Sequence, residues 1–173
     1  MLTREQIIEA ERRAKELHSR VKETFTERSR EPAAESNWRD ACAVWHSSEF
    51  ATDILWSDGF MARLRDSQRE AVSDAILFLE VDPWYFRSGY LKARLIRGLK
   101  RAKLTERDKL RLRNVIWNVA RGRNRPEFRK YCALAVRIRT REFEDALLSA
   151  AAHEKLKANG KLGYLAKYLA EHK

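Results

Sequence analysis

Apolar residues recur every three or four positions along almost the whole of this sequence, and this spacing constrains the fold more than any other feature. The clearest case is one narrow stripe along a helix expected over about 3–27: Ile7, Ala10, Ala14, Leu17, Val21 and Phe25. Thr3 and Gln6 match a capping box at its start. No segment shows the alternation of a strand, and only 6 glycines and 3 prolines interrupt the chain, so the sequence predicts an all-α fold.

We expect about seven or eight helices, packed as an antiparallel array or an irregular bundle in a single domain over 1–173 without a linker. The apolar pattern marks helical segments over about 3–27, 37–46, a stretch from Ser47 or Ser48 to a break or kink at 57–59, 67–81, 83–102, 105–121, 126–139, 140–159 and a last short one that carries residues 162–169. The polar segment 28–36 is expected to be a loop. Asp82 and Pro83 together indicate a helix start, with Asp82 as the N-cap and Pro83 at the first helical position.

Positive charge is concentrated in the second half of the chain. Residues 1–86 hold 12 basic and 17 acidic side chains, a formal charge of −5, whereas 87–173 hold 24 basic and 8 acidic, a formal charge of +16. The segment 87–141 alone carries 19 basic and 3 acidic residues. Such a concentration of positive charge attracts polyanions.

Several classes of protein are disfavoured by composition. Cys42 and Cys132 make no disulfide framework, which indicates a reducing compartment, and we expect a cytoplasmic protein. No apolar run approaches the roughly 18 residues that a membrane span requires. Cys42 and His46 lie four residues apart, but no second pair completes a metal site, so we expect no metal and no cofactor. No feature indicates a small-molecule substrate.

The expected helix 83–102 has two distinct faces. Its core face carries Trp84, Leu91, Leu95, Leu99 and Ala102. Its second face carries one aromatic and four basic residues: Arg87, Tyr90, Arg94, Arg97 and Arg101. Guanidinium groups match phosphate oxygens, and a tyrosine ring can stack on a base. The alternative is that these arginines pair with carboxylates of residues 1–86.

A second basic surface is expected on the helix 105–121 and the loop after it. The face opposite the apolar one carries Arg107, Arg111, Asn114, Asn118 and Arg121. The densest basic cluster follows: Arg123, Arg125, Arg129 and Lys130. Arg and Asn side chains in one row can contact phosphates and base edges. We therefore predict that both sets of residues, with the second face of the helix 83–102, bind a polyanion.

Residues 75–87 and 114–129 resemble each other, since each contains a helix end, a turn with proline and a Phe-Arg pair. Phe86 and Phe128 lie 42 residues apart, as do Ile96 and Ile138. The stretch over about 65–140 therefore resembles a divergent HEAT-like pair of helical repeats. This resemblance implies an architecture of stacked helix pairs and no activity.

The function that the sequence favours is a non-enzymatic module that binds a polyanion, with nucleic acid as the expected partner, through 87–141. No nucleophile with a neighbouring base can be identified, so catalysis is not expected. One alternative is a scaffold for an acidic protein partner. A further alternative is an enzyme like the HEAT-like DNA glycosylases, which would need a carboxylate beside an aromatic pocket.

Overall fold

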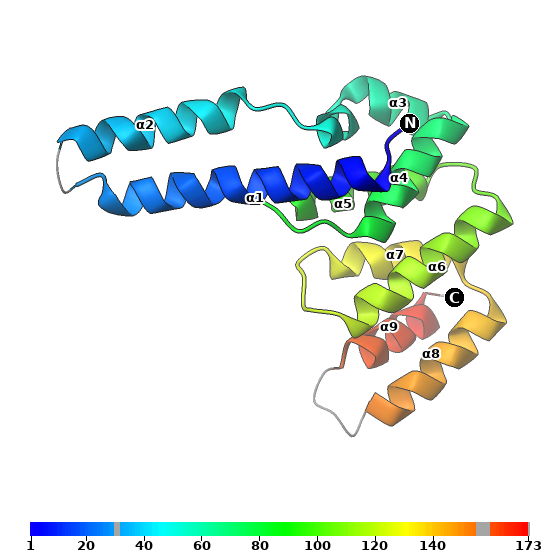
Figure 1. Cartoon of the computed structure of the whole chain (residues 1–173). Helices are drawn as coiled ribbons and strands as arrows, with labels where there is room; N and C mark the ends of the chain where they lie inside the picture. The colour runs from blue at the N-terminus through cyan, green and yellow to red at the C-terminus, as the bar shows by residue number, and fades with distance from the viewer. Residues whose placement is uncertain (30–31, 155–159, 173) are drawn as a thin grey trace.

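The computed structural model describes residues 1–29, 32–154 and 160–172, and within these ranges the chain is helical with no strand (Figure 1). Its elements are α1 (Arg4–Glu27), α2 (Pro32–Ser47), the 3₁₀ helix η1 (Ala51–Trp56), α3 (Asp58–Arg65), α4 (Arg69–Val81), α5 (Ser88–Leu99), α6 (Glu106–Arg121), α7 (Phe128–Ile138), α8 (Arg141–Glu154) and α9 (Lys161–Glu171). The all-α prediction is confirmed. The described residues form ten helices, close to the expected number, and the expected break at 57–59 separates η1 from α3, whose N-cap is Ser57.

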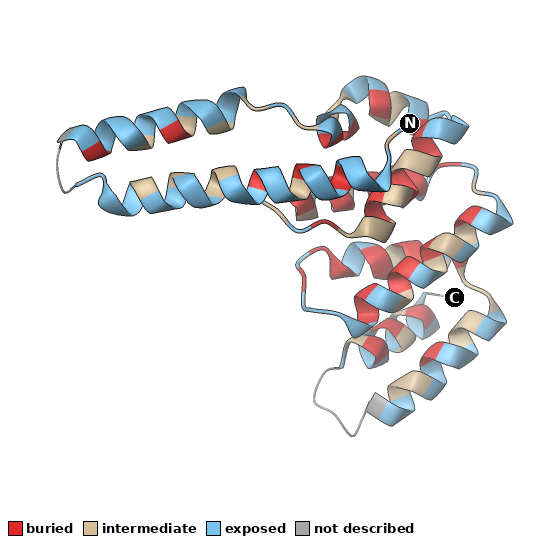
Figure 2. Ribbon diagram, viewed as in Figure 1, coloured by how far each residue is buried: buried red, intermediate tan, exposed pale blue. Residues whose placement is uncertain are grey.

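Helices α1 and α2 lie side by side as a long hairpin whose far end projects from the other helices (Figure 1). The capping box is confirmed, since Thr3 Oγ1 accepts from the backbone N–H of Gln6 and Gln6 Oε1 accepts from that of Thr3. Only the first half of the predicted stripe is buried, and Phe25 is 48% exposed. The reason is that only the first half of α1 packs on η1 and α4, while the second half contacts α2 (Figure 2).

The loop predicted over 28–36 is shorter than expected, because α2 begins at Pro32. A proline suits the first turn of a helix, where its missing N–H has no helical partner. The hairpin is held to the rest of the chain near its middle. There Glu11 Oε1 accepts from the backbone N–H of Trp84 at 3.0 Å, and the rings of His18 and Phe86 stack with centroids 4.9 Å apart.

One hydrophobic core extends from Ile7 in α1 to Leu169 in α9. Its centre is formed by α4–α7, where α4 packs against α5 and α6, and α5 packs against α7. In Figure 2 the buried residues are concentrated in these helices. Helix α9 buries Leu162, Leu165 and Leu169 as the sequence predicted, and packs along α8. The predicted end of α8 near 159 lies outside the described residues.

The prediction of a helix starting at Pro83 is wrong. Asp82 is the C-cap of α4, not an N-cap, and its φ of 53° and ψ of 47° place it in the left-handed region. Residues 83–87 form a turn, and α5 starts only at Ser88, whose Oγ accepts from the backbone N–H of Tyr85. Trp84 therefore leaves the core face and is 38% exposed.

The start of α6 was predicted correctly and has a further partner. Asp108 accepts from the backbone N–H and the hydroxyl of Thr105, and from Arg69 of α4 at 2.8 and 3.2 Å. Burial alone would raise the pKa of Asp108, but these hydrogen bonds outweigh burial and lower the pKa to about 2. The cap of α6 thus also ties α6 to α4.

No helix in the described part of the chain combines the length and the apolar character that crossing a membrane requires.

We predict that Asp108→Asn destabilises the protein only above acidic pH. The folded state lowers the pKa of Asp108 from an unfolded value near 3.9 to about 2, so its carboxylate stabilises the fold above about pH 4 and loses this effect as the pH falls toward 2. At pH 7 we expect a loss of about 1–2 kcal/mol, discounted because Arg69 is largely exposed. Urea unfolding of both proteins between pH 7 and pH 3 measures this. If the difference in free energy of unfolding between the two proteins stayed constant down to pH 3, the Asp108 carboxylate would not have this stabilising role.

A second prediction concerns Gly98, where α5 packs closely against α3. A Cβ on Gly98 would lie 2.5 Å from Cδ2 of the fully buried Leu64. Gly98→Ala should therefore lower the free energy of unfolding by about 1–3 kcal/mol, despite the better helix propensity of alanine. The matched control is Gly163→Ala in α9, where no atom lies within 4 Å and we expect a gain of about 0.5–1 kcal/mol. Denaturant unfolding measures the free energy of unfolding of both variants. If Gly98→Ala were stabilised as Gly163→Ala is, the close packing of Gly98 on Leu64 would be refuted.

Candidate functional site

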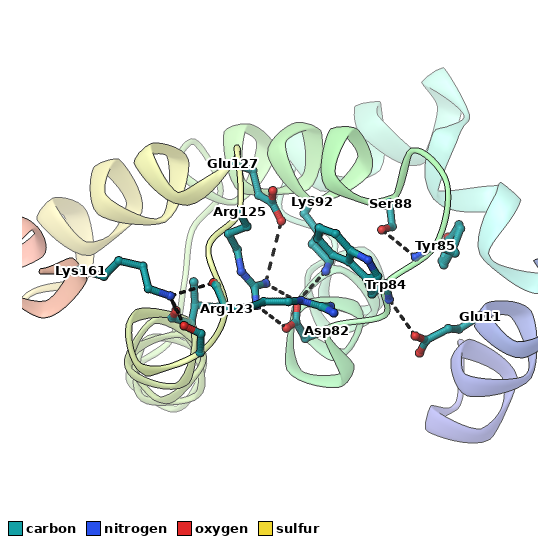
Figure 3. A network of polar contacts seen from close by, with 12 residues as sticks. Glu11, Asp82, Trp84, Tyr85, Ser88, Lys92, Arg123, Arg125, Glu127 and Lys161 are labelled. Atoms are coloured by element: carbon teal, nitrogen blue, oxygen red, sulfur yellow. Dashed lines mark hydrogen bonds and ion pairs between the residues drawn. The ribbon is translucent and has the colours of Figure 1, made fainter. Parts of the chain in front are cut away.

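A buried ionic cluster joins three parts of the fold (Figure 3). Asp82, at the end of α4, accepts from Lys92 Nζ of α5 at 2.6 Å. It also accepts from Arg125 Nη1 and Nη2, in the connection between α6 and α7, at 2.6 and 2.8 Å. Lys92 is 0% exposed and Arg125 is buried. Burial would raise the pKa of Asp82, but the hydrogen bonds from Arg125 and Lys92 lower it below its ordinary value.

The loop 121–125 is held in place by its contacts rather than presented freely. Arg125 points inward to Asp82, so its predicted role as a polyanion contact is replaced by a structural one. The Arg123 guanidinium lies 3.8 Å from the centroid of the Trp84 ring. Lys161 of α9 donates to the backbone carbonyls of Val119, Gly122 and Arg123.

Two further predicted contact residues are paired with carboxylates of the first half. Arg94 of α5 donates to Asp58 at 2.7 Å. Arg111 of α6 donates through Nε and Nη2 to both oxygens of Glu80, each at 2.7 Å. The pair of Arg125 with Asp82 is of the same kind. For these three arginines the structure shows the alternative stated above, in which basic residues pair with carboxylates of residues 1–86.

Other basic residues line a hollow between α5 and α7 that contains no carboxylate among the described residues. Its volume is about 420 Å³, and Tyr168 of α9 forms part of its wall. Its cations are Arg97 and Lys100 from α5 with Arg129 and Lys130 from α7. Arg97, Arg129 and Lys130 were predicted from the sequence. Lys100 was not, although its position three residues after Arg97 is the helical spacing that could have identified it.

A second hollow of about 490 Å³ continues the first and shares Arg97, Pro126 and Lys130 with it. Its walls include three aromatic residues, Trp84, Tyr85 and Tyr90, with Arg87 at the start of α5. Tyr90 is 74% exposed. We call the two hollows together the α5–α7 groove; it has a basic end at Lys100 and Arg129 and an aromatic end at Trp84 and Tyr90.

The aromatic end also contains Glu127, which sequence reasoning did not single out. Glu127 is buried, and its Oε1 has no hydrogen-bond partner. The nearest cation is Arg125, whose Nη1 lies 3.9 Å from Oε1. A carboxylate beside an aromatic pocket is the combination that the glycosylase-like alternative requires. That alternative stays a prediction, since the groove does not by itself define a reaction.

The remaining predicted residues do not join the groove. Asn114 and Asn118 line a separate hollow of about 590 Å³ between α4 and α6, together with Arg111 and the carboxylates Glu80 and Asp82. Arg101, Arg107 and Arg121 are exposed and line neither hollow of the groove. The structure thus brings together only a subset of the predicted contacts: Arg87, Tyr90, Arg97, Arg129 and Lys130.

No protein-family model, no curated protein and no solved structure matches this chain. The HEAT-like repeat over about 65–140 therefore stays a prediction.

We predict that Asp82→Asn strongly destabilises the fold. Removing the carboxylate charge would leave Lys92 buried without a neutralising partner and Arg125 with only Glu127 at 3.9 Å, which costs about 3–5 kcal/mol. The matched control is Asp58→Asn, which removes the same charge from the exposed pair with Arg94 and should cost less than about 1 kcal/mol. Thermal or urea unfolding compares the two variants. Similar losses in both would show that the buried cluster does not stabilise the fold.

Proposed function

We propose that this protein is a non-enzymatic module that binds single-stranded nucleic acid in the α5–α7 groove. The observation that carries the proposal is the unpaired state of the cations at the basic end. Within the described residues, Arg97, Lys100, Arg129 and Lys130 form no ion pair and no side-chain hydrogen bond, unlike Arg94 and its paired neighbours. Cations held together without a carboxylate repel one another, and a bound phosphate relieves that repulsion.

The aromatic end of the groove supports a single strand over a duplex. Non-specific binding of single strands combines a positively charged groove with aromatic side chains on which bases stack. Tyr90 is the most accessible ring beside the groove, and it stands on the same helix as Arg97. A paired base keeps its face covered by its neighbours, whereas an unpaired base can present its face to this ring.

An acidic protein partner, the alternative from the sequence, would use the same cations but has no need of the aromatic end. Purification before and after nuclease treatment separates the two. Loss of co-purifying absorbance at 260 nm supports nucleic acid, and a stoichiometric protein that resists nuclease supports the alternative.

We predict that Arg97→Glu combined with Lys130→Glu lowers affinity for a fluorescein-labelled 12-nucleotide single strand on the order of 100-fold, because two charge-assisted contacts are lost. Both side chains are exposed, so the melting temperature should change little. Fluorescence anisotropy across a salt series should give the wild type a log–log slope of roughly −2 to −3, about −0.7 for each phosphate contacted. The four cations at the basic end set the upper limit on the number of phosphates contacted there, and so on the steepness of this slope.

The control is Arg13→Glu combined with Arg20→Glu on α1, which changes the net charge equally but lies outside the groove. We expect this variant to bind within about threefold of the wild type, because exposed charges that lie more than about a Debye length from the strand are screened. An equal loss in both variants would mean that net charge alone drives binding. Unchanged affinity in the groove variant would refute the groove as the site.

A further inference from the structure

A further hollow, of about 410 Å³, lies between α1 and the turn 83–87. Two residues of the turn, Trp84 and Tyr85, line both this hollow and the aromatic end of the α5–α7 groove. The rest of its wall comes from Phe86 and from four residues of α1: Lys15, His18, Ser19 and Lys22. We call it the α1 hollow. Because the two share the turn, the α1 hollow adjoins the groove at its aromatic end.

Positive charge at the α1 hollow is concentrated at Lys22. Within the described residues no carboxylate lines this hollow, and the exposed Lys22 forms no ion pair and no side-chain hydrogen bond. Lys15, in contrast, pairs with Glu11 at 2.5 Å. Glu11 stands three turns of helix before Lys22, about 16 Å along the axis of α1. Glu23 follows Lys22 in the sequence but accepts from Ser19 Oγ, at 2.9 Å.

His18 adds a neutral hydrogen-bond donor beside this cation. It precedes Lys22 by one helical turn on the same face of α1, and its ring stacks on Phe86. Burial, and after it the charge of Lys22, lower the pKa of His18. The imidazole is therefore mainly uncharged at neutral pH and offers one N–H. An unpaired ammonium group and a ring N–H on one face form a combination that suits a phosphate oxygen.

We propose that the α1 hollow binds a phosphate of the strand whose neighbouring nucleotides occupy the α5–α7 groove. Lys22 supplies the charge for this phosphate, and His18 donates a hydrogen bond to it. The strand crosses the turn beside the ring of Phe86, which is 51% exposed. This proposal rests on the proposed function, because the groove holds the rest of the strand.

The rings between the two basic sites favour a strand over a separate small anion. Trp84, Phe86 and Tyr90 are all exposed, and they lie on the turn and the first turn of α5, between Lys22 and the cations of the basic end. A nucleic acid strand alternates charged phosphates with bases that stack on aromatic rings. Such a strand matches a basic site, exposed rings and a second basic site in succession. Free phosphate would need only Lys22 and His18.

Reversing the charge of Lys22 tests the α1 hollow. For a fluorescein-labelled strand of 12 thymidines, Lys22→Glu should lower affinity about tenfold, because a charge-assisted contact is replaced by repulsion. The log–log salt slope should become shallower by about 0.7, the value for one phosphate contact. Lys22→Gln, which removes the charge without reversing it, should lower affinity about threefold. Fluorescence anisotropy across a salt series measures both variants, and an unchanged melting temperature is expected because Lys22 is exposed.

The matched control is Arg20→Glu, which changes the net charge by the same amount on the same helix. Arg20 is exposed, forms no ion pair within the described residues, and does not line the α1 hollow. It lies two residues before Lys22, so its side chain projects about 200° away around the axis of α1. We expect this variant to bind the strand within about twofold of the wild type.

The outcomes separate this inference from the proposed function. Equal effects of Lys22→Glu and Arg20→Glu, with binding still lost on reversal of Arg97 and Lys130, would overturn the phosphate site on α1 and leave strand binding in the groove standing. Wild-type affinity in Lys22→Glu would also overturn it, and would be the result if the hollow held only a separate anion. Absence of binding of the wild type to the strand would refute the proposed function itself.

Discussion

The partly buried carboxylate of Asp82, held by the buried side chains of Lys92 and Arg125, is the group on which the arrangement of the central helices depends. It connects the end of α4, the middle of α5 and the segment that leads into α7. Lys92 lies two residues after Tyr90, and Arg125 lies two residues before Glu127. The same ionic contact therefore ties α5 to the segment that leads into α7 (Figure 3). The cations of α5 and α7 then line a common groove.

The excess positive charge of 87–141 has two different roles that the sequence does not distinguish. Arg94, Arg111 and Arg125 are paired with carboxylates of the first half and hold helices together. Arg97 and Lys130 have no such partner in the described residues and line the groove. Net charge thus indicated the half of the chain that lines the groove but not which of its residues line it, since a partner 31 or 43 positions away decides which role an arginine has.

Features fixed by neighbouring residues were predictable, and features fixed by distant ones were not. The capping box at Thr3 is local and is present as expected, and the start of α6 at Thr105, also predicted, has a capping box of the same local kind. Asp82 followed by Pro83 fits a helix start by local rules. However, Asp82, in contact with Lys92 and Arg125, is the left-handed C-cap of α4, and α5 begins only at Ser88. Glu127 gave no signal, because its isolation from hydrogen-bond partners exists only once α5 and α7 are packed.

The two ends of the groove differ in whether a carboxylate lines them, and this difference would give a bound strand a fixed orientation. A phosphate at the aromatic end would meet the carboxylate of Glu127, whereas at the basic end it meets Arg129 and Lys100 without any carboxylate in the lining. A base at the basic end would find fewer aromatic walls. In the proposed complex, one arrangement therefore satisfies both ends, with the base beside Tyr90 and the phosphates toward α7. A groove that was basic throughout would hold a strand as firmly but would not fix its position along the groove.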